Sequence, residues 1–404
     1  MKGIEVRLAD ICEVITKGTT PSNIGEEFTT DGVRYIRSEM INSSKNISEE
    51  GVLYISEETH DKLKRSQLKS GDILFSMAGV YLGKTAILRE RDVPANTNQA
   101  VALIRVNPKK CNREYIYYFL NLPAIVKSVN SMTAQAAQPN INLRQIGNIP
   151  IVLPPQEVQD RVVAVISPYD DLIENNQKQI KLLEEAAQRL YKEWFVDLRF
   201  PGHENTKITD GVPEGWRMAV LSEIASVNKE SISKQYPYDY VDYIDIGAVS
   251  KGQINSVTRL STKDAPGRAK RIAFDGDVLW GMVRPNLKSY ALVFHPKETS
   301  VFSTGFAILH AEKVPFSFLY CHVTQDEFVS YLINCTNGAA YPAVKPSHFE
   351  NAVLLVPTDM VLSKFHSLVG QMFRQAEILE QKNQQAIEAR DRLLPKLMSG
   401  EIEV

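Results

Sequence analysis

The feature that most constrains the fold is an internal repeat that runs through the chain of 404 residues. The segment GDILFSM at 71–77 recurs as GDVLWGM at 276–282, and IPIVLP at 149–154 corresponds to AVLLVP at 352–357. Near the start we match VRLA at 6–9 with WRMA at 216–219, and later AAQP at 136–139 with AAYP at 339–342. The copies keep the same order while their offset drifts only from 210 to 203. A collinear repeat of this length indicates duplication, so we expect two similar folding units in one chain.

Each copy is expected to consist of a compact domain followed by a long helix. Short β-rich runs at 101–106 and 306–310 alternate with turn clusters and a helix-like stretch at 113–130, which is typical of an α+β domain. The predicted fold class is therefore α+β, with two similar α/β domains joined by two long helices that pack on one another. The expected boundaries are 1–153 for the first domain, 154–200 for the first helical region, 201–356 for the second domain and 357–404 for the second helical region.

The two helical regions carry a heptad pattern, which is the signature of a coiled coil. In the first, a short amphipathic helix is expected to end before Ser167-Pro168, which suit the N-cap and first residue of a long helix over about 169–195. In the second, the long helix is expected to begin near Gly370 and to run over about 369–394. The predicted seam residues are Ile173, Asn176, Ile180, Leu183, Leu190, Met372, Leu379, Asn383 and Leu393. The alternative is that each helix lies on its own domain.

A glycine-containing loop at 76–85, SMAGVYLGKT, resembles a phosphate-binding loop but departs from it in two respects. The phosphate-binding pattern requires a glycine where Ala78 stands, and Pro94 comes too early for the helix that should follow the lysine. The second copy, MVRPNLK at 282–288, has no glycine in this span. We therefore expect a hairpin loop between strands at 73–77 and 85–88, with an ATP site that survives in one copy as the alternative.

Composition and charge narrow the class of function. Four widely spaced cysteines without a C-x-x-C motif and seven histidines without an H-x-x-x-H motif provide no set of metal ligands. The chain lacks an apolar run long enough to span a membrane and begins without a signal-peptide pattern, so we expect a cytoplasmic protein. The net charge of −2 does not by itself indicate nucleic acid, but basic runs at 60–91 and 263–288 recur at similar positions in the two copies. Matched basic runs favour DNA binding over an ordinary solvated surface.

No catalytic constellation is visible in the sequence. The only Pro-Pro pair lies in LPPQ at 153–156, whereas an adenine methyltransferase carries Asn/Asp-Pro-Pro-Tyr/Phe. A glycine-rich strand-to-helix turn for S-adenosylmethionine is also missing. We therefore expect a non-catalytic chain that binds no cofactor and no metal itself.

Three segments carry a resemblance to the specificity subunits of Type I restriction–modification systems: LPPQEVQDRVV at 153–163, LYKEWFVDLRFP at 190–201 and RDRLLPKLMSGEIEV at 390–404. The segment KGTTPS at 17–22 and the two Gly-Asp turns are consistent with it, and the resemblance covers almost the full length. It implies two target-recognition domains joined by two helices that pair as an antiparallel coiled coil in a pseudo-two-fold repeat. Each domain is implied to read one half of a bipartite site in double-stranded DNA. It also implies two methyltransferase subunits as partners, which use S-adenosylmethionine to methylate adenine, and a restriction (translocase) subunit.

The helix lengths are compatible with such a role. A helix of ~26 residues is roughly 39 Å long, close to the ~34–36 Å of one turn of B-DNA. We therefore expect the coiled coil to set the length of an unread spacer. Two other functions stay open: a specificity subunit whose partner fuses methylase and nuclease, and a non-catalytic adaptor that binds proteins. Steeply salt-dependent DNA binding would distinguish the adaptor from the other two.

The predicted DNA-binding residues are polar and basic loop residues, because Lys, Arg, Asn and Gln reach phosphates and base edges. In the first domain they are Lys17, Thr19, Thr20, Ser22, Tyr81, Lys84, Asn96, Asn98, Gln99, Gln135, Gln138 and Asn140. In the second domain they are Arg268, Lys270, Arg271, Arg284, Asn286, Lys288, Tyr341 and Lys345. The aromatic residues Tyr115, Tyr117, Tyr118 and Phe119 are expected in a helix core and not in a base-stacking platform.

Overall fold

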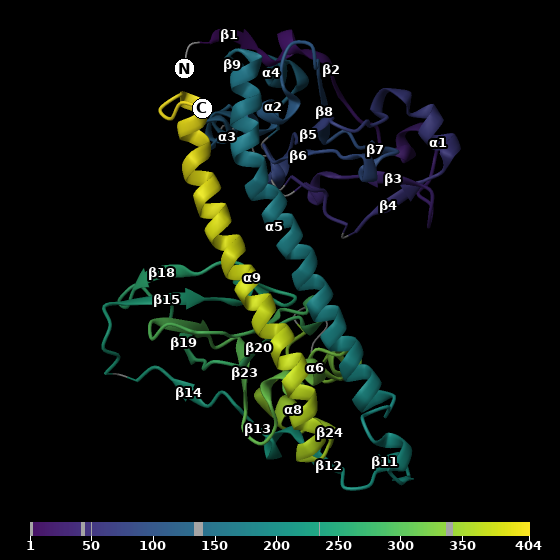
Figure 1. The fold of residues 1–404 in the computed structure, drawn as a ribbon, viewed down its shortest axis with the longest axis vertical. Helices are drawn as coiled ribbons and strands as arrows, with labels where there is room; N and C mark the ends of the chain where they lie inside the picture. Colours follow the sequence, from purple (N-terminus) through teal and green to yellow (C-terminus); the bar gives the residue numbers. More distant parts are fainter. Residues whose placement is uncertain (1–2, 42–44, 50, 133–139, 234, 337–341) are drawn as a thin grey trace. The chain divides into compact units, whose positions relative to one another are not determined.

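The computed structural model describes residues 3–41, 45–49, 51–132, 140–233, 235–336 and 342–404. The chain divides into two compact units: unit 1 comprises Met1–Glu174 and Asn383–Val404, and unit 2 comprises Asn175–Lys382. Each unit contains one α+β domain, and the long helices α5 (Gln156–Tyr191) and α9 (Asp359–Ser399) each contribute one part to each unit (Figure 1). The predicted fold class is confirmed.

A four-stranded antiparallel sheet lies in each unit, and its strand order is the same in both. In unit 1 the order is β2 (Cys12–Lys17), β8 (Val101–Val106), β5 (Ile73–Ser76) and β6 (Thr85–Ile87). In unit 2 it is β13 (Ala225–Val227), β23 (Phe306–Ala311), β20 (Val278–Gly281) and β21 (Tyr290–Leu292). The predicted hairpin between 73–77 and 85–88 is therefore confirmed, since β5 pairs antiparallel with β6.

A second sheet has two strand pairings in common between the units. In unit 1 β3 (Val33–Ile36) lies between β4 (Leu53–Ile55), to which it is antiparallel, and β7 (Ala95–Thr97), to which it is parallel. In unit 2 β15 (Tyr240–Ile244) lies in the same way between β18 (Thr258–Ser261) and β22 (Ser300–Ser303). Unit 2 extends this sheet by β19 (Ala269–Ile272) and β14 (Glu230–Ser231). Unit 2 also carries the small hairpins β10 (Ile208–Thr209) with β11 (Val212–Pro213) and β16 (Val249–Ser250) with β17 (Gln253–Ile254).

A two-stranded antiparallel ribbon precedes the long helix in each copy and corrects the repeat alignment at the start of the chain. It pairs β1 (Ile4–Arg7) with β9 (Pro150–Leu153) in unit 1, and β12 (Arg217–Val220) with β24 (Val353–Val356) in unit 2. Arg7 pairs with Pro150 as Val220 pairs with Val353, so the offset at this point is 213. The match of 6–9 with 216–219 is therefore wrong by three residues. The physical equivalence is between LADI at 8–11 and LSEI at 221–224, because Asp10 and Glu223 each accept a backbone N–H from the residue three positions earlier.

The two Gly-Asp turns are built alike. Gly71 and Gly276 adopt φ of +87° and +86°, the left-handed region that glycine favours. Asp72 and Asp277 are buried, and each accepts a backbone N–H from three residues earlier in the turn. Asp72 also pairs with Arg105 at 2.7 Å. These turns explain why this stretch of the repeat is so easily recognised in the sequence.

The short helices show that the offset becomes constant in the second half of each copy. In unit 1 they are α1 (Glu57–Lys62), α2 (Arg113–Leu120), α3 (Pro123–Ser131) and α4 (Leu143–Gly147). In unit 2 they are α6 (Phe316–Val323), α7 (Asp326–Asn334) and α8 (Pro346–Glu350). The pairs α2/α6, α3/α7, α4/α8, β9/β24 and α5/α9 all begin 203 residues apart. The predicted helical stretch at 113–130 is two helices, because Pro123 begins the second one.

The long helices differ from the prediction at their beginnings. Helix α5 starts at Gln156 and continues without a break through Pro168, so the predicted short helix and restart at Ser167-Pro168 are wrong. Proline usually ends a helix, but here Ile166 and Asp170 on either side are buried and hold the turn in place. Helix α9 starts at Asp359 and not near Gly370, because Phe365 and Val369 are buried and Gly370 lies inside the packed helix. A π-helical turn, Lys192–Val196, ends the first helical region.

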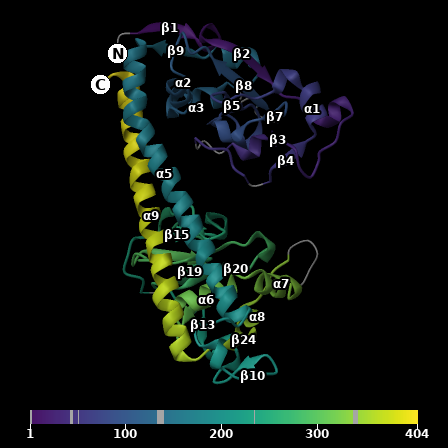
Figure 2. The same ribbon diagram turned by 45° about the vertical axis from the view of Figure 1, so that its right-hand side comes forward.

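Within each unit one part of α5 lies beside one part of α9 (Figures 1 and 2). In unit 1 Val162 and Ile166 of α5 and Leu394 and Leu397 of α9 belong to one core cluster. In unit 2 Ile180 and Leu183 of α5 pack with Ala376 and Leu379 of α9. Buried apolar contacts therefore hold the two helices together in both units, at about 25 cal/mol for each Å² of apolar surface removed from water.

The domain cores are large and aromatic. The aromatic residues of α2 are buried in unit 1, which confirms that Tyr115, Tyr117, Tyr118 and Phe119 belong to a helix core. In unit 2 Trp280 is fully buried and its indole N–H donates to the carbonyl of Val323 at 2.9 Å. In the part of the chain that is described, no helix has the length and apolar character needed to cross a membrane.

Candidate nucleic-acid interface

Three segments of unit 1 meet at the loop end of the β5–β6 hairpin. The hairpin loop spans 77–84 and is closed by Gly83 N–H donating to Ser76 O at 2.9 Å. The backbone N–H of Met77 donates to Ala100 O at 2.8 Å, and that of Ile141 donates to Met77 O at 2.9 Å. We call the hairpin loop, the turn at 98–100 and the segment at 140–141 the loop edge of unit 1.

Unit 2 builds the same loop edge from its own hairpin. Met282 N–H donates to Gly305 O at 2.9 Å, and Val344 N–H donates to Met282 O at 2.9 Å. Isolated bridges complete the correspondence, since Ala78 pairs with Asn140 as Val283 pairs with Ala343. The loop edge of unit 2 therefore comprises 282–289, 303–305 and 343–344. One backbone frame thus carries two different sets of side chains.

The segment KGTT at 17–20 is fixed beside the loop edge of unit 1. Gly18 N–H donates to Asn98 O at 3.0 Å, and a Cβ at Gly18 would lie only 1.7 Å from the carbonyl oxygen of Thr97. Only glycine permits this close approach. The Thr20 hydroxyl donates to Gln99 Oε1, and Arg65 donates to Thr19 Oγ1 at 3.1 Å. Predicted residues from distant parts of the sequence are thus brought together here.

A tyrosine on the central strand of the second sheet supports the predicted residues in both units. Tyr35 of β3 donates its hydroxyl to Thr19 O at 3.0 Å. Tyr243, at the corresponding position of β15, accepts a hydrogen bond from Arg268 Nε at 3.0 Å. Arg268 also lies 3.7 Å from Asp245, and its backbone carbonyl accepts Thr304 N–H at 2.7 Å. Neither tyrosine was predicted, and an unaligned sequence holds no signal for either.

The hairpin loop of unit 2 holds two basic residues in an unusual backbone conformation. Arg284 and Lys288 adopt φ of +50° and +54° on either side of the turn Pro285–Leu287. A residue with a side chain adopts this region at a cost of about 1–3 kcal/mol, and such residues concentrate at functional sites. Lys288 forms an ion pair with Asp326 at 2.7 Å, whereas Arg284 and Asn286 are exposed. In unit 1 the corresponding loop places the Lys84 ammonium 5.1 Å from the centroid of the Tyr81 ring.

One predicted DNA-binding residue is wrong. Asn96 lies on β7 with 0% of its surface exposed. Its amide donates to Leu63 O and to Ser66 Oγ, both at 3.1 Å, and its oxygen contacts His60. The amide is therefore fully used inside the domain and is not available to a base edge.

The remaining predicted residues fall into three groups. Lys17, Ser22, Gln99, Asn140, Arg268, Lys270, Arg284, Asn286 and Lys345 are exposed, while Thr19, Thr20, Tyr81, Lys84, Asn98, Arg271 and Lys288 are half-buried. Lys270 and Arg271 lie on β19, whose first residue, Ala269, pairs with Ser303 of the loop edge. Gln135, Gln138 and Tyr341 lie outside the described residues. Arg65 was missed as an individual site residue, although the basic run at 60–91 contains it.

The two basic runs are less positive in the structure than their sequences suggest. Arg89 and Arg91 both pair with Glu174 of α5, the latter at 2.8 Å. Lys62 pairs with Glu26 and Glu58, both at 2.7 Å. In the second run Lys288 pairs with Asp326, so part of each run attaches one segment to another and only the remainder is available to a phosphate backbone.

The predicted seam residues lie on the paired faces of α5 and α9. Ile173, Asn176, Ile180, Leu379 and Asn383 are buried. Leu183, Leu190, Met372 and Leu393 are partly buried against the core clusters. Asn176 and Asn383 are buried polar residues, and a role for them in fixing register stays a prediction.

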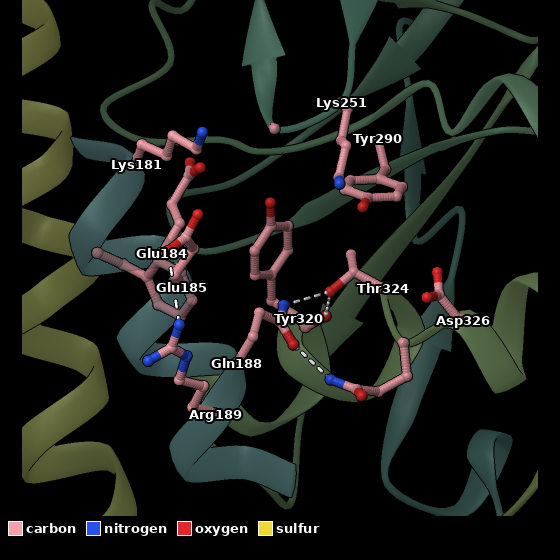
Figure 3. A pocket seen from close by; sticks show the side chains of 13 residues that line it. Lys181, Glu184, Glu185, Gln188, Arg189, Lys251, Tyr290, Tyr320, Thr324 and Asp326 are labelled. Carbon is pink, nitrogen blue, oxygen red and sulfur yellow. Dashed lines mark hydrogen bonds and ion pairs between the residues drawn. The ribbon is translucent and has the colours of Figure 1, made fainter. Parts of the chain in front are cut away.

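A cavity of about 520 Å³ lies in unit 2 between α5 and the domain (Figure 3). Glu184 and Gln188 of α5, Tyr290 of β21, Tyr320 of α6 and Lys251 of the β16–β17 turn line it. Burial raises the pKa of Glu184 to about 7, with Lys251 opposing the rise and Glu380 adding to it. Among the described residues the Glu184 carboxylate has no hydrogen bond or direct ion pair, so only the attraction of Lys251 offsets its charge.

No metal site and no activated thiol is found among the described residues. Cys12, Cys111, Cys321 and Cys335 are free thiols, and burial raises the pKa of Cys12 to about 12 and of Cys111 to about 11. In the same ranges no three His, Cys, Asp or Glu side chains are grouped so as to hold a metal ion.

Comparison with known proteins gives consistent results. Residues 1–185 match the family model described as the Type I restriction modification DNA specificity domain. The Type I restriction enzyme MjaIX specificity subunit of Methanocaldococcus jannaschii is 26% identical, over 98% of this chain and 93% of its own length. The putative type I restriction enzyme MjaX specificity subunit of the same organism is 31% identical, over 54% of this chain and 51% of its own length. In fold, the chain is similar to the crystal structure of the Type-I restriction-modification system S subunit from M. genitalium, with a TM-score of 0.57, 13% identity and coverage of 98% and 95%.

Proposed function

We propose that the chain is the DNA-reading subunit of a Type I restriction–modification system, because residues 1–185 match the specificity-domain model and the MjaIX specificity subunit is similar over 98% of the chain. Each unit reads one half of a bipartite site in duplex DNA through its loop edge. The observation that carries this proposal is one backbone frame presenting different polar and basic side chains in the two units, among them Gln99 and Lys84 in unit 1 and Arg284 and Asn286 in unit 2. Two readers of different half-sites need such an arrangement, because the frame places the loop and the side chains select the bases.

The paired helices have a second role in the proposal, as a spacer and as a docking site for partners. Helix α5 has 36 residues and α9 has 41, so each is more than ~50 Å long at ~1.5 Å per residue. They hold two methyltransferase subunits, which bring S-adenosylmethionine and the catalytic residues, and through them a restriction subunit. The chain itself supplies recognition and no catalysis.

Two measurements test the proposal. Mapping methylated adenines in host DNA, with and without this gene, is expected to show a bipartite motif that depends on the gene. Inserting one heptad into each of α5 and α9 adds ~10 Å of helix, or roughly three base pairs at ~3.4 Å per step. The recognised spacer is therefore expected to lengthen by about three base pairs while both half-sites stay the same. An unchanged spacer would rule out the helices as the ruler, and a gene-independent methylation pattern would rule out DNA reading altogether.

A further inference from the structure

The constant offset of 203 allows residues of α2 and α5 to be compared directly with those of α6 and α9. Both the short helices and the long helices begin 203 residues apart, and so does the strand between them. Unit 1 contains the first part of α5 and the last part of α9, whereas unit 2 contains the first part of α9 and the last part of α5. We call 383–399 the α9 tail and 180–196 the α5 tail, the latter including the π-helical turn. The two tails occupy equivalent places in the two units.

Unit 1 holds the α9 tail through a buried polar network. Asp170 of α5 is 7% exposed, and its carboxylate accepts a hydrogen bond from the Tyr118 hydroxyl at 2.5 Å. Arg390 of the α9 tail donates to the other carboxylate oxygen at 2.7 Å. The Arg390 side chain is 23% exposed, and its second nitrogen lies 2.9 Å from Asp391 at the solvent side. The acid of α5 and the base of the α9 tail thus compensate one another inside the unit.

Unit 2 has apolar residues at all three equivalent positions. Cys321 corresponds to Tyr118, Phe373 to Asp170 and Ala187 to Arg390. All three are buried in the core cluster of unit 2. The same joint between tail, helix and domain is therefore made by an ion pair in one unit and by apolar packing in the other.

The tails also differ in volume where they enter the cores. Tyr191 and Trp194 of the α5 tail are buried in the aromatic core of unit 2, where Tyr191 also bonds to His322 at 2.8 Å. Their equivalents in the α9 tail are Leu394 and Leu397, which are buried in the core of unit 1. The side chains of each tail thus match the space in the core of their own unit. Replacing large by small side chains in a packed core is destabilising, and so is the reverse.

From these differences we infer that unit 1 selects its partner helix, accepting the α9 tail and rejecting the α5 tail. A duplicated chain faces a specific hazard, because α5 is complete before α9 exists and can meet the α5 of a second copy of the chain. In such a pair the α5 tail of the second copy would occupy unit 1, with Ala187 opposite Asp170. The Asp170 carboxylate would then be buried without its cation, which is costly. The network therefore disfavours pairing of like with like and directs each chain to fold on itself.

The test exchanges the tail in the full-length chain and reads each unit separately by amide hydrogen exchange. In the chimera, residues 383–399 are replaced by the sequence of 180–196, so that only unit 1 receives a foreign tail. Amides of unit 1 are expected to exchange at least about a hundredfold faster than in the wild-type chain. Removing one partner of a buried ion pair raises the equilibrium constant for opening of unit 1 by at least that factor. Amides of unit 2, whose residues are unchanged, are expected to keep their protection.

A second chimera isolates the network from the change in volume. It carries the same foreign tail but retains Arg390, and its unit 1 is expected to recover at least about tenfold of the lost protection. Asp170→Phe in the first chimera is expected to recover protection as well, because it removes the acid that lacks a partner. If the two chimeras exchange equally fast, the charge network does not select. If the first chimera protects unit 1 as the wild type does, unit 1 selects nothing and the inference is overturned.

Discussion

The Glu184 carboxylate has no direct ion pair among the described residues, and it makes the stability of unit 2 depend on pH in a direction that can be calculated. Burial raises its pKa from an ordinary 4.5 to about 7. A carboxyl whose pKa is raised on folding contributes its full stability below the unfolded pKa, and that contribution is lost as the pH rises through the folded pKa. Unit 2 is therefore expected to lose stability between about pH 4.5 and pH 7 through this group.

The magnitude follows from the two pKa values. A shift of about 2.5 corresponds to about 3 kcal/mol at pH 8, where both states are ionised, and to less than about 1 kcal/mol at pH 5. The Glu184 side chain is only partly buried, so screening by solvent reduces the expected difference to about 2 kcal/mol. Replacing Glu184→Gln keeps the size of the side chain and removes the charge. The variant is therefore expected to be about 2 kcal/mol more stable than the wild type at pH 8, and to differ little at pH 5.

Amide exchange of unit 2, measured at both pH values and corrected for the intrinsic rate, provides the assay. The comparison of variant and wild type at each pH cancels every other titrating group. The matched control is Glu185→Gln on the same helix, whose side chain is 44% exposed and pairs with Arg189 at 4.0 Å, and which is expected to bring no gain at pH 8. Equal effects of Glu184→Gln at pH 5 and pH 8 would refute the reasoning.

Two further predictions concern unit 1. Asn96→Ala is expected to destabilise unit 1 by about 1–3 kcal/mol, since it removes one donor to Leu63 O, the donor to Ser66 Oγ and the buried oxygen that His60 contacts, and to leave the methylated motif unchanged; a shifted motif would return Asn96 to the interface. Arg65→Ala and Lys84→Ala are each expected to weaken DNA binding and to reduce the slope of log affinity against log salt by about 0.9, as measured by fluorescence anisotropy. Lys109→Ala, an exposed lysine outside the loop edge, is the control, and a slope that changes equally in all three variants would argue against these contacts.

The architecture was predictable because the repeat and the heptads are patterns of backbone and burial. Strands β8 and β23 and the β5–β6 hairpin lie where alternation and turn residues predicted them. The helix beginnings were not predictable, because Pro168 and Gly370 are local signals for a boundary and tertiary packing overrides them. The start of the repeat was misaligned for a similar reason, since a shared alanine is visible in the letters and the pairing of Arg7 with Pro150 is not.

The candidate site was predictable in part. Thr19, Thr20 and Gln99 were predicted because they are polar turn residues. They lie close together in the structure because turns lie at the ends of paired strands. Asn96 was misjudged because the amide of an asparagine can hydrogen-bond either to groups inside its own domain or to a base. Only its neighbours in three dimensions distinguish the two cases. Tyr35 and Tyr243 were missed because each acts through a backbone or a side chain far along the chain.

The shrinking offset between the copies has a genetic consequence. The offset falls from 213 at the first ribbon to 205 at β5 and β20 and to 203 at α2 and α6. The two halves of the gene therefore differ in length only ahead of α2 and α6. The offset changes by eight residues, from 213 to 205, between the first ribbon and β5, and by two residues, from 205 to 203, between β8 and α2, while the hydrogen-bonded frame around the hairpin kept its register. A crossover between the two halves, or with another copy of the gene, would thus deliver a domain that fits the same frame. New recognition can arise by reshuffling without redesign of the scaffold.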